Sequence, residues 1–326
     1  MEKRERVLTA LDGRRVDRLP FTVWRHHYFQ DRTAEGLAEA TVRFYQRHHL
    51  DMILFTPGPF YMAEAWGMDI RAFGNDDIPH YIVSPIVERA PDWRHLPEID
   101  LETCSLQREI QAVRQVRQQL GQDDVPLIVQ LLSPLTTADM LCNGRIVEDL
   151  RSFSNDLRSG LQVIATLTRD FALACLDAGA DGFFFISRFA SRDKMRTREY
   201  RDFGQRFDAE VLEPLADNAA IRLLCLEGEN LFFDLADRYP VQAVCWETWR
   251  ADLSMAAASR QVRCGLMGGL NPMVFAGGSA QDVRGEIAEA VSQTGGWHLL
   301  IAPSGPLPPG YDPTLVDAVY QAVQEA

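Results

Sequence analysis

Short, almost wholly apolar runs alternate with longer amphipathic segments along this chain. Such runs are typical of strands buried on both faces, as in a parallel sheet. We expect strands at residues 19–24, 51–56, 80–84, 125–132, 181–186, 220–226, 241–246, 263–267 and 297–302. We expect helices near residues 34–48, 103–121, 145–178, 195–217, 229–238, 253–261, 280–293 and 312–325. The alternation therefore predicts an α/β protein.

The number of strand–helix units points to a closed barrel. Alternation of this kind builds βαβ units and a parallel sheet. About eight units in one chain predict a single (β/α)8 TIM barrel over residues 1–326, with an N-terminal helical extension. No GxGxxG or GxxxxGK[ST] motif follows the first predicted strand, which argues against a Rossmann domain and a P-loop.

The chain is strongly acidic. Its 33 basic and 46 acidic side chains give a net charge of −13, which disfavours binding to nucleic-acid phosphates or to an anionic membrane surface. The first residues are charged and lack the apolar core of a signal peptide. The longest apolar stretch, near residues 125–135, is too short to span a membrane. We therefore expect a cytoplasmic protein that binds neither nucleic acid nor membrane.

In a barrel of this type the active site lies at the carboxyl ends of the strands. Polar and aromatic residues follow most of the predicted strands, which implies a small-molecule substrate. The candidates are Trp24, Arg25, His26, His27, Thr56, Pro57, Ser133, Ser187, Arg188, Cys225, Glu227, Glu229, Trp246, Glu247, Met267 and Ser304.

Cys225 and Glu227 are the strongest candidates for catalysis. They are two residues apart on a predicted strand, so both side chains point to the same face. Both residue types bind zinc, and a buried carboxylate is costly unless it is paired. Glu227 is interpreted as a base, a metal ligand or the ion-pair partner of Arg188 or Arg25. Cys225 is interpreted as a ligand, a nucleophile or a buried thiol, since the six cysteines form no CxxC pair.

Basic residues follow the first predicted strand. The planar guanidinium of Arg25 suits a substrate carboxylate, although an internal ion pair is the alternative. His26 and His27 are neighbours, so on an extended segment only one is expected to face the pocket, for acid–base or ligand work. Ser304 is predicted either to donate to a substrate anion or to lie in a plain turn.

Aromatic residues near the strand ends either line a large flat pocket or form ordinary core. We assign Trp24, Tyr61 and Trp246 to substrate binding, together with Arg188 and Glu247. This assignment predicts that all five side chains face one cavity.

Four stretches of the chain carry a family pattern. They are RERVLTALDGRRVDRLPF at 4–21, AGADGFFF at 178–185, GGLNP at 268–272 and WHLLIAPSGPLPPGYDP at 297–313. In this order and spacing they resemble the uroporphyrinogen decarboxylase superfamily, whose chains begin with a basic helix, an A-L-x-G turn and a D-R-x-P entry into the first strand. The residues that match this opening are Ala10, Leu11, Gly13, Asp17, Arg18 and Pro20. The resemblance covers essentially the whole chain and implies a (β/α)8 barrel.

The decarboxylases of this superfamily use an aspartate on the pyrrole NH groups, arginines on the carboxylates, a tyrosine and a histidine. Their first arginine matches Arg25. The other groups fall on Phe29, Pro57, Met140 and Gly305. The resemblance therefore implies a barrel that lacks the charge needed to stabilise a protonated pyrrole.

The methyltransferase branch moves methyl groups between a corrinoid and a thiol, with zinc on a His-x-Cys pair and a later cysteine. Cys225 and Glu227 match the pair, and Gly305 falls on the later cysteine. The resemblance implies zinc on Cys225 and Glu227, and a corrinoid delivered by a partner protein. The third ligand is open, with Glu229, Glu247, His26 and His27 as candidates.

Three functions remain open at this stage. The first is metal-assisted methyl transfer between a corrinoid or methylated substrate and a thiol-type acceptor. The second is a decarboxylase or other lyase that acts on a tetrapyrrole or smaller carboxylated substrate, with Arg25 as the carboxylate clamp and without metal. The third is a ligand-binding barrel without catalysis, because a fold does not guarantee its family's chemistry. The resemblance also implies a homodimer.

Overall fold

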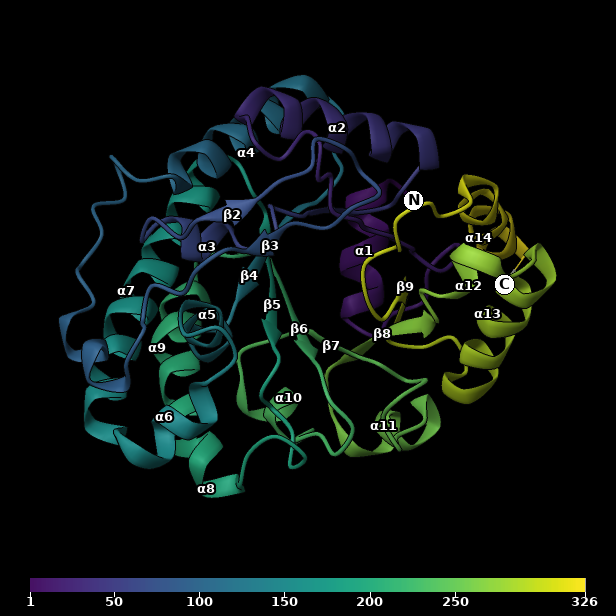
Figure 1. The fold of residues 1–326 in the computed structure, drawn as a ribbon. Coiled ribbons are helices and arrows are strands. Elements are labelled where there is room, and N and C mark those ends of the chain that lie inside the picture. The colour runs from purple at the N-terminus through teal and green to yellow at the C-terminus, as the bar shows by residue number, and fades with distance from the viewer. Residues whose placement is uncertain (326) are drawn as a thin grey trace.

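A sheet of seven parallel strands curls around the centre of the molecule, in the order β1-β4-β5-β6-β7-β8-β9 (Figure 1). The computed structural model describes residues 1–325. The strands are almost entirely buried, as their apolar composition predicts. Their bounds are β1 Ile53–Phe55, β4 Leu127–Leu132, β5 Gly182–Ser187, β6 Ile221–Leu226, β7 Ala243–Trp246, β8 Gly265–Leu270 and β9 Leu299–Pro303.

Residues 19–24 close the sheet into a barrel. Phe21 forms a parallel bridge with Ile301 of β9, and the Thr22 amide donates to the Ile301 carbonyl at 3.0 Å. On the other side the Thr22 hydroxyl donates to the Met52 carbonyl at 2.7 Å, and the Asp51 amide donates to the Phe21 carbonyl at 3.0 Å. This segment therefore lies between β9 and β1 and fills the position of the eighth strand, which confirms the predicted (β/α)8 barrel.

Helices surround the strands (Figure 1). Long amphipathic helices pack their apolar faces on the barrel, as at α7, where Leu161, Ile164 and Phe171 are fully buried. The helices before β6 are α1 Lys3–Leu11, α2 Ala34–His48, α3 Tyr61–Glu64, α4 Leu106–Leu120, α5 Pro134–Leu141, α6 Ile146–Ser152, α7 Ser154–Asp177, α8 Thr197–Tyr200 and α9 Arg206–Leu215. Those after β6 are α10 Leu235–Arg238, α11 Met255–Gln261, α12 Val274–Gly277, α13 Ala280–Thr294 and α14 Pro313–Glu325.

One predicted barrel strand is wrong. Residues 80–84 contribute only β3 (Tyr81–Ile82), which pairs antiparallel with β2 (Ile70–Arg71) in a small hairpin outside the barrel. Tyr81 and Val83 are about half exposed, and Ile82 packs only against the outside of the core, so the run forms no strand of the barrel. The predicted helix at 229–238 also shortens to α10, because residues 227–234 form a turn after β6.

An ion-pair network closes the amino-terminal end of the barrel; we call it the barrel base. Asp51, which is fully buried, accepts from Arg6 at 2.8 Å and from Arg18 at 2.6 Å. It also accepts from the Phe21 amide at 3.0 Å, and Arg6 holds Asp17 at 2.8 Å. Helix α1 thereby packs against the strand starts, as the predicted N-terminal extension.

None of the helices formed by residues 1–325 is both long and apolar enough to cross a membrane.

Candidate functional site

Charged side chains gather where the strands end. We call this region the barrel mouth, and it contains His26, Arg188, Glu227 and Glu247. Arg188 follows β5 and Glu227 follows β6, and their Nε and Oε2 atoms lie 3.3 Å apart. The two side chains are 39% and 31% exposed. This confirms that Glu227 pairs with Arg188, one of the two partners that the sequence offered.

The Arg188 guanidinium is not saturated by this pair. Its Nε atom is buried and makes no hydrogen bond within residues 1–325, and the contact with Glu227 is a single long one. The backbone is fixed more firmly, because the Arg188 amide donates to Thr136 Oγ1 at 3.1 Å and Lys194 donates to the Arg188 carbonyl. The Nη1 and Nη2 atoms make no hydrogen bond within residues 1–325, and a guanidinium with such unused donors suits an incoming carboxylate.

Glu247 stands beside Glu227 at the end of β7. Burial raises the pKa of Glu247, and the negative charge of Glu227 raises it further. Arg250 acts in the opposite direction, and its Nη1 lies 3.5 Å from Glu247 Oε2. Two neighbouring carboxyls with unequal surroundings can divide the roles of acid and base between them.

The structure answers which histidine faces the mouth. His26 donates from Nδ1 to the Pro57 carbonyl at 3.0 Å, and burial, with the nearby charge of Arg188, lowers its pKa to about 4. The ring is therefore neutral near pH 7, and its Nε2 is an acceptor. His27 turns away toward α2, where its ring lies edge-on to Phe44 and burial lowers its pKa to about 3.

The residues expected to hold zinc are not arranged as a metal site. Cys225 is only 3% exposed and lies in register with Cys245 on β7. The contact with Cys245, together with burial, raises the pKa of the Cys225 thiol well above its usual range. Within residues 1–325 no three His, Cys, Asp or Glu side chains gather around one point. As they stand, these residues do not fit the ion.

Cys225 and Glu227 nevertheless have a close counterpart on the next strand. Cys245 and Glu247 repeat the Cys-x-Glu spacing on β7, and the register pairs Cys225 with Cys245. Both thiols therefore lie side by side within the barrel, one layer below the two carboxyls. The repeat was visible in the sequence, but only the register shows that the two copies are neighbours.

Arg25 lies at the rim rather than in the mouth. Its Nη2 is 3.4 Å from Asp76 Oδ2, its Nε donates to the His26 carbonyl at 3.1 Å, and its guanidinium lies 5.3 Å from the centre of the Tyr311 ring. An internal ion pair was the alternative for Arg25, and the loop between β2 and β3 supplies Asp76 as its partner. Arg25 is therefore engaged in an internal ion pair here, and its role as a carboxylate clamp stays a prediction.

Tyr61 and Trp246 are core residues here. The Tyr61 hydroxyl donates to the Gln130 carbonyl at 3.0 Å, and the Trp246 indole donates to the Leu253 carbonyl at 3.0 Å. Both side chains are almost completely buried, so neither presents a surface to the mouth.

Trp24 and Ser304 are also buried. Trp24 lies edge-on to Phe184 inside the barrel, with 5.4 Å between the ring centres. The amide and hydroxyl of Ser304 both donate to the Leu270 carbonyl, at 3.1 and 3.4 Å. Ser304 thus follows the plain-turn interpretation in this structure.

A buried polar network supports the mouth from behind. Tyr200 and Tyr239 donate their hydroxyls to Asp208 Oδ2 at 2.8 and 2.7 Å, and Ser187 at the end of β5 contacts the Tyr200 hydroxyl at 3.0 Å. No cation pairs with Asp208 among residues 1–325, and burial raises its pKa to about 7. Ser187 was predicted to be a site candidate, but its side chain faces this network.

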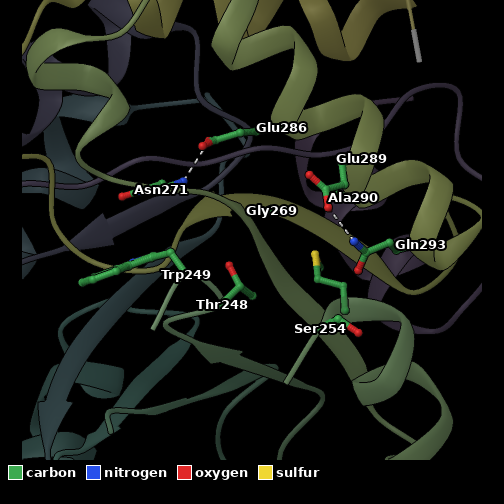
Figure 2. A pocket seen from close by; sticks show the side chains of 10 residues that line it. Thr248, Trp249, Ser254, Gly269, Asn271, Glu286, Glu289, Ala290 and Gln293 are labelled. Carbon is green, nitrogen blue, oxygen red and sulfur yellow. Dashed lines mark hydrogen bonds between the residues drawn. The ribbon is translucent and has the colours of Figure 1, made fainter. Parts of the chain in front are cut away.

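A cavity of about 240 Å³ opens beside the mouth, between the loop after β7, the end of β8 and helices α11 and α13 (Figure 2). No sequence pattern pointed to this cavity, because the glutamates of α13 look like an ordinary solvent-facing pattern. It is lined by Thr248, Trp249, Ser254, Met255, Gly269, Asn271, Glu286, Glu289, Ala290 and Gln293.

The closed parallel barrel with ionisable groups at its carboxyl end defines a (β/α)8 protein with an enzyme-like mouth. The family model of uroporphyrinogen decarboxylase (URO-D) matches residues 2–326, and the chain belongs to this family. Comparison with curated protein sequences finds no match.

Solved structures share the fold. A methyltransferase from Methanosarcina mazei superposes with a TM-score of 0.80 at 20% identity, covering 100% of this chain and 99% of that one. A B12-independent methionine synthase from Shewanella sp. W3-18-1 gives a TM-score of 0.58 at 12% identity, covering 94% and 95%. A putative vitamin-B12 independent methionine synthase from Listeria monocytogenes gives 0.53 at 12%, with the same coverage. At these identities the likeness concerns the fold alone.

Proposed function

We propose that this chain is a lyase that removes carbon dioxide from a small carboxylated substrate bound at the barrel mouth. The observation that carries the proposal is the Arg188 guanidinium: its Nε lies 3.3 Å from Glu227 Oε2, while its Nη1 and Nη2 make no hydrogen bond within residues 1–325. A carboxylate is the group that such a planar donor set recognises best.

The neighbouring groups supply the rest of the chemistry. The substrate carboxylate binds Arg188, and cleavage of its bond to carbon releases carbon dioxide and leaves the electron pair on that carbon. Glu247, whose raised pKa keeps a proton available closer to neutrality, then protonates the carbon. Glu227 holds Arg188 in place, and neutral His26 offers Nε2 as an acceptor to the substrate.

The substrate that we propose is not uroporphyrinogen. Four positions that carry decarboxylase groups in the resemblance hold Phe29, Pro57, Met140 and Gly305 here. Pro57 stands at the position of the aspartate that would stabilise a protonated pyrrole. Its carbonyl already accepts a hydrogen bond from His26. A smaller acid, whose own structure stabilises the carbanion, needs no such partner.

The test is carbon dioxide release from uroporphyrinogen and from a panel of small di- and tricarboxylic acids, with chelator-treated protein. We expect release from a small acid and a loss of roughly 10- to 100-fold in kcat/KM for Arg188→Ala, as for a charged hydrogen bond. Arg198→Ala is the matched control, because the Arg198 side chain is 85% exposed on α8. Release that is unchanged in Arg188→Ala contradicts the proposal, and saturable binding without release favours the non-catalytic barrel.

Methyl transfer is the second candidate, and the paired Cys-x-Glu segments favour it. Two neighbouring strands each carry one soft and one hard metal donor: the thiols of Cys225 and Cys245, and the carboxyls of Glu227 and Glu247. That function requires zinc on Cys225 and Glu227, which do not fit the ion as they stand, and a corrinoid delivered by a partner protein. About one zinc per chain, lost in both Cys225→Ala and Glu227→Ala, would support this candidate over the lyase; the homodimer stays a prediction.

A further inference from the structure

The cavity beside the mouth has an acidic and aromatic lining. Its ten lining residues include Glu286 and Glu289 but no lysine or arginine. Figure 2 shows the two glutamates entering from α13, while Trp249 lies on the opposite side, in the loop after β7. A hollow of this composition attracts positive charge and repels the carboxylates that the mouth would bind.

The two carboxyls are held in place but are not neutralised. Glu286 Oε2 accepts from the Asn271 amide at 2.9 Å, and Glu289 Oε1 accepts from the Gln293 side chain at 2.9 Å. Neither forms an ion pair with any residue from 1 to 325. They stand three residues apart on one helix face, where like charges repel. Burial raises the pKa of Glu286, and the charges of Asp282 and Glu289 raise it further.

The other residues that line the cavity favour an organic cation over a metal ion. A metal ion needs several converging donors, and residues 1–325 provide no group of three acidic, Cys or His side chains around one point. Trp249 offers instead a half-exposed indole, and Met255 a polarizable thioether. An alkylammonium group gains from both, through cation–π attraction and through contact with the sulfur.

We infer that this cavity binds a small organic cation with an alkylated ammonium head. The head would lie between the Trp249 indole and the carboxyls of Glu286 and Glu289. The volume of about 240 Å³ is below the range of drug-sized pockets, so the ligand is a small amine. Because Thr248 directly follows Glu247, the bound cation stands next to the mouth, but the inference does not rest on the proposed lyase reaction.

The test is calorimetric titration of the full chain with tetramethylammonium chloride, against sodium chloride at the same ionic strength. Saturable binding of one cation per chain is expected. Trp249→Ala should weaken it by about 3- to 30-fold, the range of a cation–π contact. Glu286→Gln and Glu289→Gln should each weaken it several-fold, and glutamine keeps the oxygen that Asn271 needs at position 286.

Matched controls separate this site from general effects. Trp297→Ala removes another half-exposed tryptophan, 56% exposed against 50% for Trp249, and should leave binding unchanged. Glu213→Gln makes the same charge change at an exposed position on α9. Three results would overturn the inference: no saturable binding of tetramethylammonium, equally tight binding of neopentyl alcohol, a neutral molecule of similar size, or equal losses of binding in the control variants. Each outcome is independent of carbon dioxide release.

Discussion

The two ends of the barrel use the same residue types in opposite ways. At the barrel base, Asp51 is fully buried between Arg6 and Arg18 at 2.8 and 2.6 Å. At the mouth, Glu227 and Arg188 stay about one third exposed and meet at 3.3 Å. The short buried contacts leave no capacity for another partner, whereas the long open contact does. Stability is therefore concentrated at one end and binding capacity at the other.

The largest effect is expected at the base. Asp51→Ala leaves Arg18 without a carboxylate and Arg6 with Asp17 alone, and we expect a loss of about 3–5 kcal/mol in the free energy of unfolding. Urea unfolding followed by circular dichroism measures it. A loss below about 1 kcal/mol would break the comparison, because the base would then be no more important for stability than an exposed pair.

Asp208 extends the comparison to a buried carboxyl without an arginine. Its pKa of about 7 lies above its ordinary value of 3.8, so the folded state binds the proton more tightly than the unfolded state. Stability should therefore fall as the pH rises from about 4 to about 7 and change little beyond.

Asp208→Asn should remove this pH-dependent part, since its amide oxygen still accepts from Tyr200 and Tyr239. The measurement is the free energy of unfolding of both proteins between pH 4 and pH 8.5. Parallel profiles would show that Asp208 does not titrate in this range.

The smallest effect on stability is expected at the mouth. Arg188→Ala should change the free energy of unfolding by less than about 1 kcal/mol, because the pair with Glu227 is partly exposed. The same variant should lose substrate binding, so stability and function separate at this residue. A thermal melt and a binding titration check both expectations. A strong destabilisation would show that Arg188 contributes to stability as Arg6 does at the barrel base.

Much of the fold could be predicted from the sequence because the barrel strands are buried on both faces and are therefore continuously apolar. The error at residues 80–84 has the same origin, since an apolar run does not reveal whether the core reaches it. The Arg188–Glu227 pair was within reach because both residues end neighbouring strands. The partner of Arg25 could not be predicted, because Asp76 lies in a loop and local sequence patterns do not determine the course of a loop.

Side-chain direction explains the other differences at the site. Cys245 and Glu247 point to one face of β7, so Trp246 between them must point to the other, toward the helices. Strand alternation alone would have excluded Trp246 from the mouth. The cavity of Figure 2 offered no comparable signal, since it depends on how far α13 stands from β8.

The segment that closes the barrel affects how the protein folds during its synthesis. Residues 19–24 leave the ribosome early, yet their partner on one side, around Ile301, is among the last segments to be translated. Until then Phe21 and its neighbours form one open apolar edge of the growing sheet, and β8 later forms the other. Such edges are sites of aggregation during synthesis. We therefore expect the nascent chain to be most prone to aggregation before β9 emerges and the barrel closes.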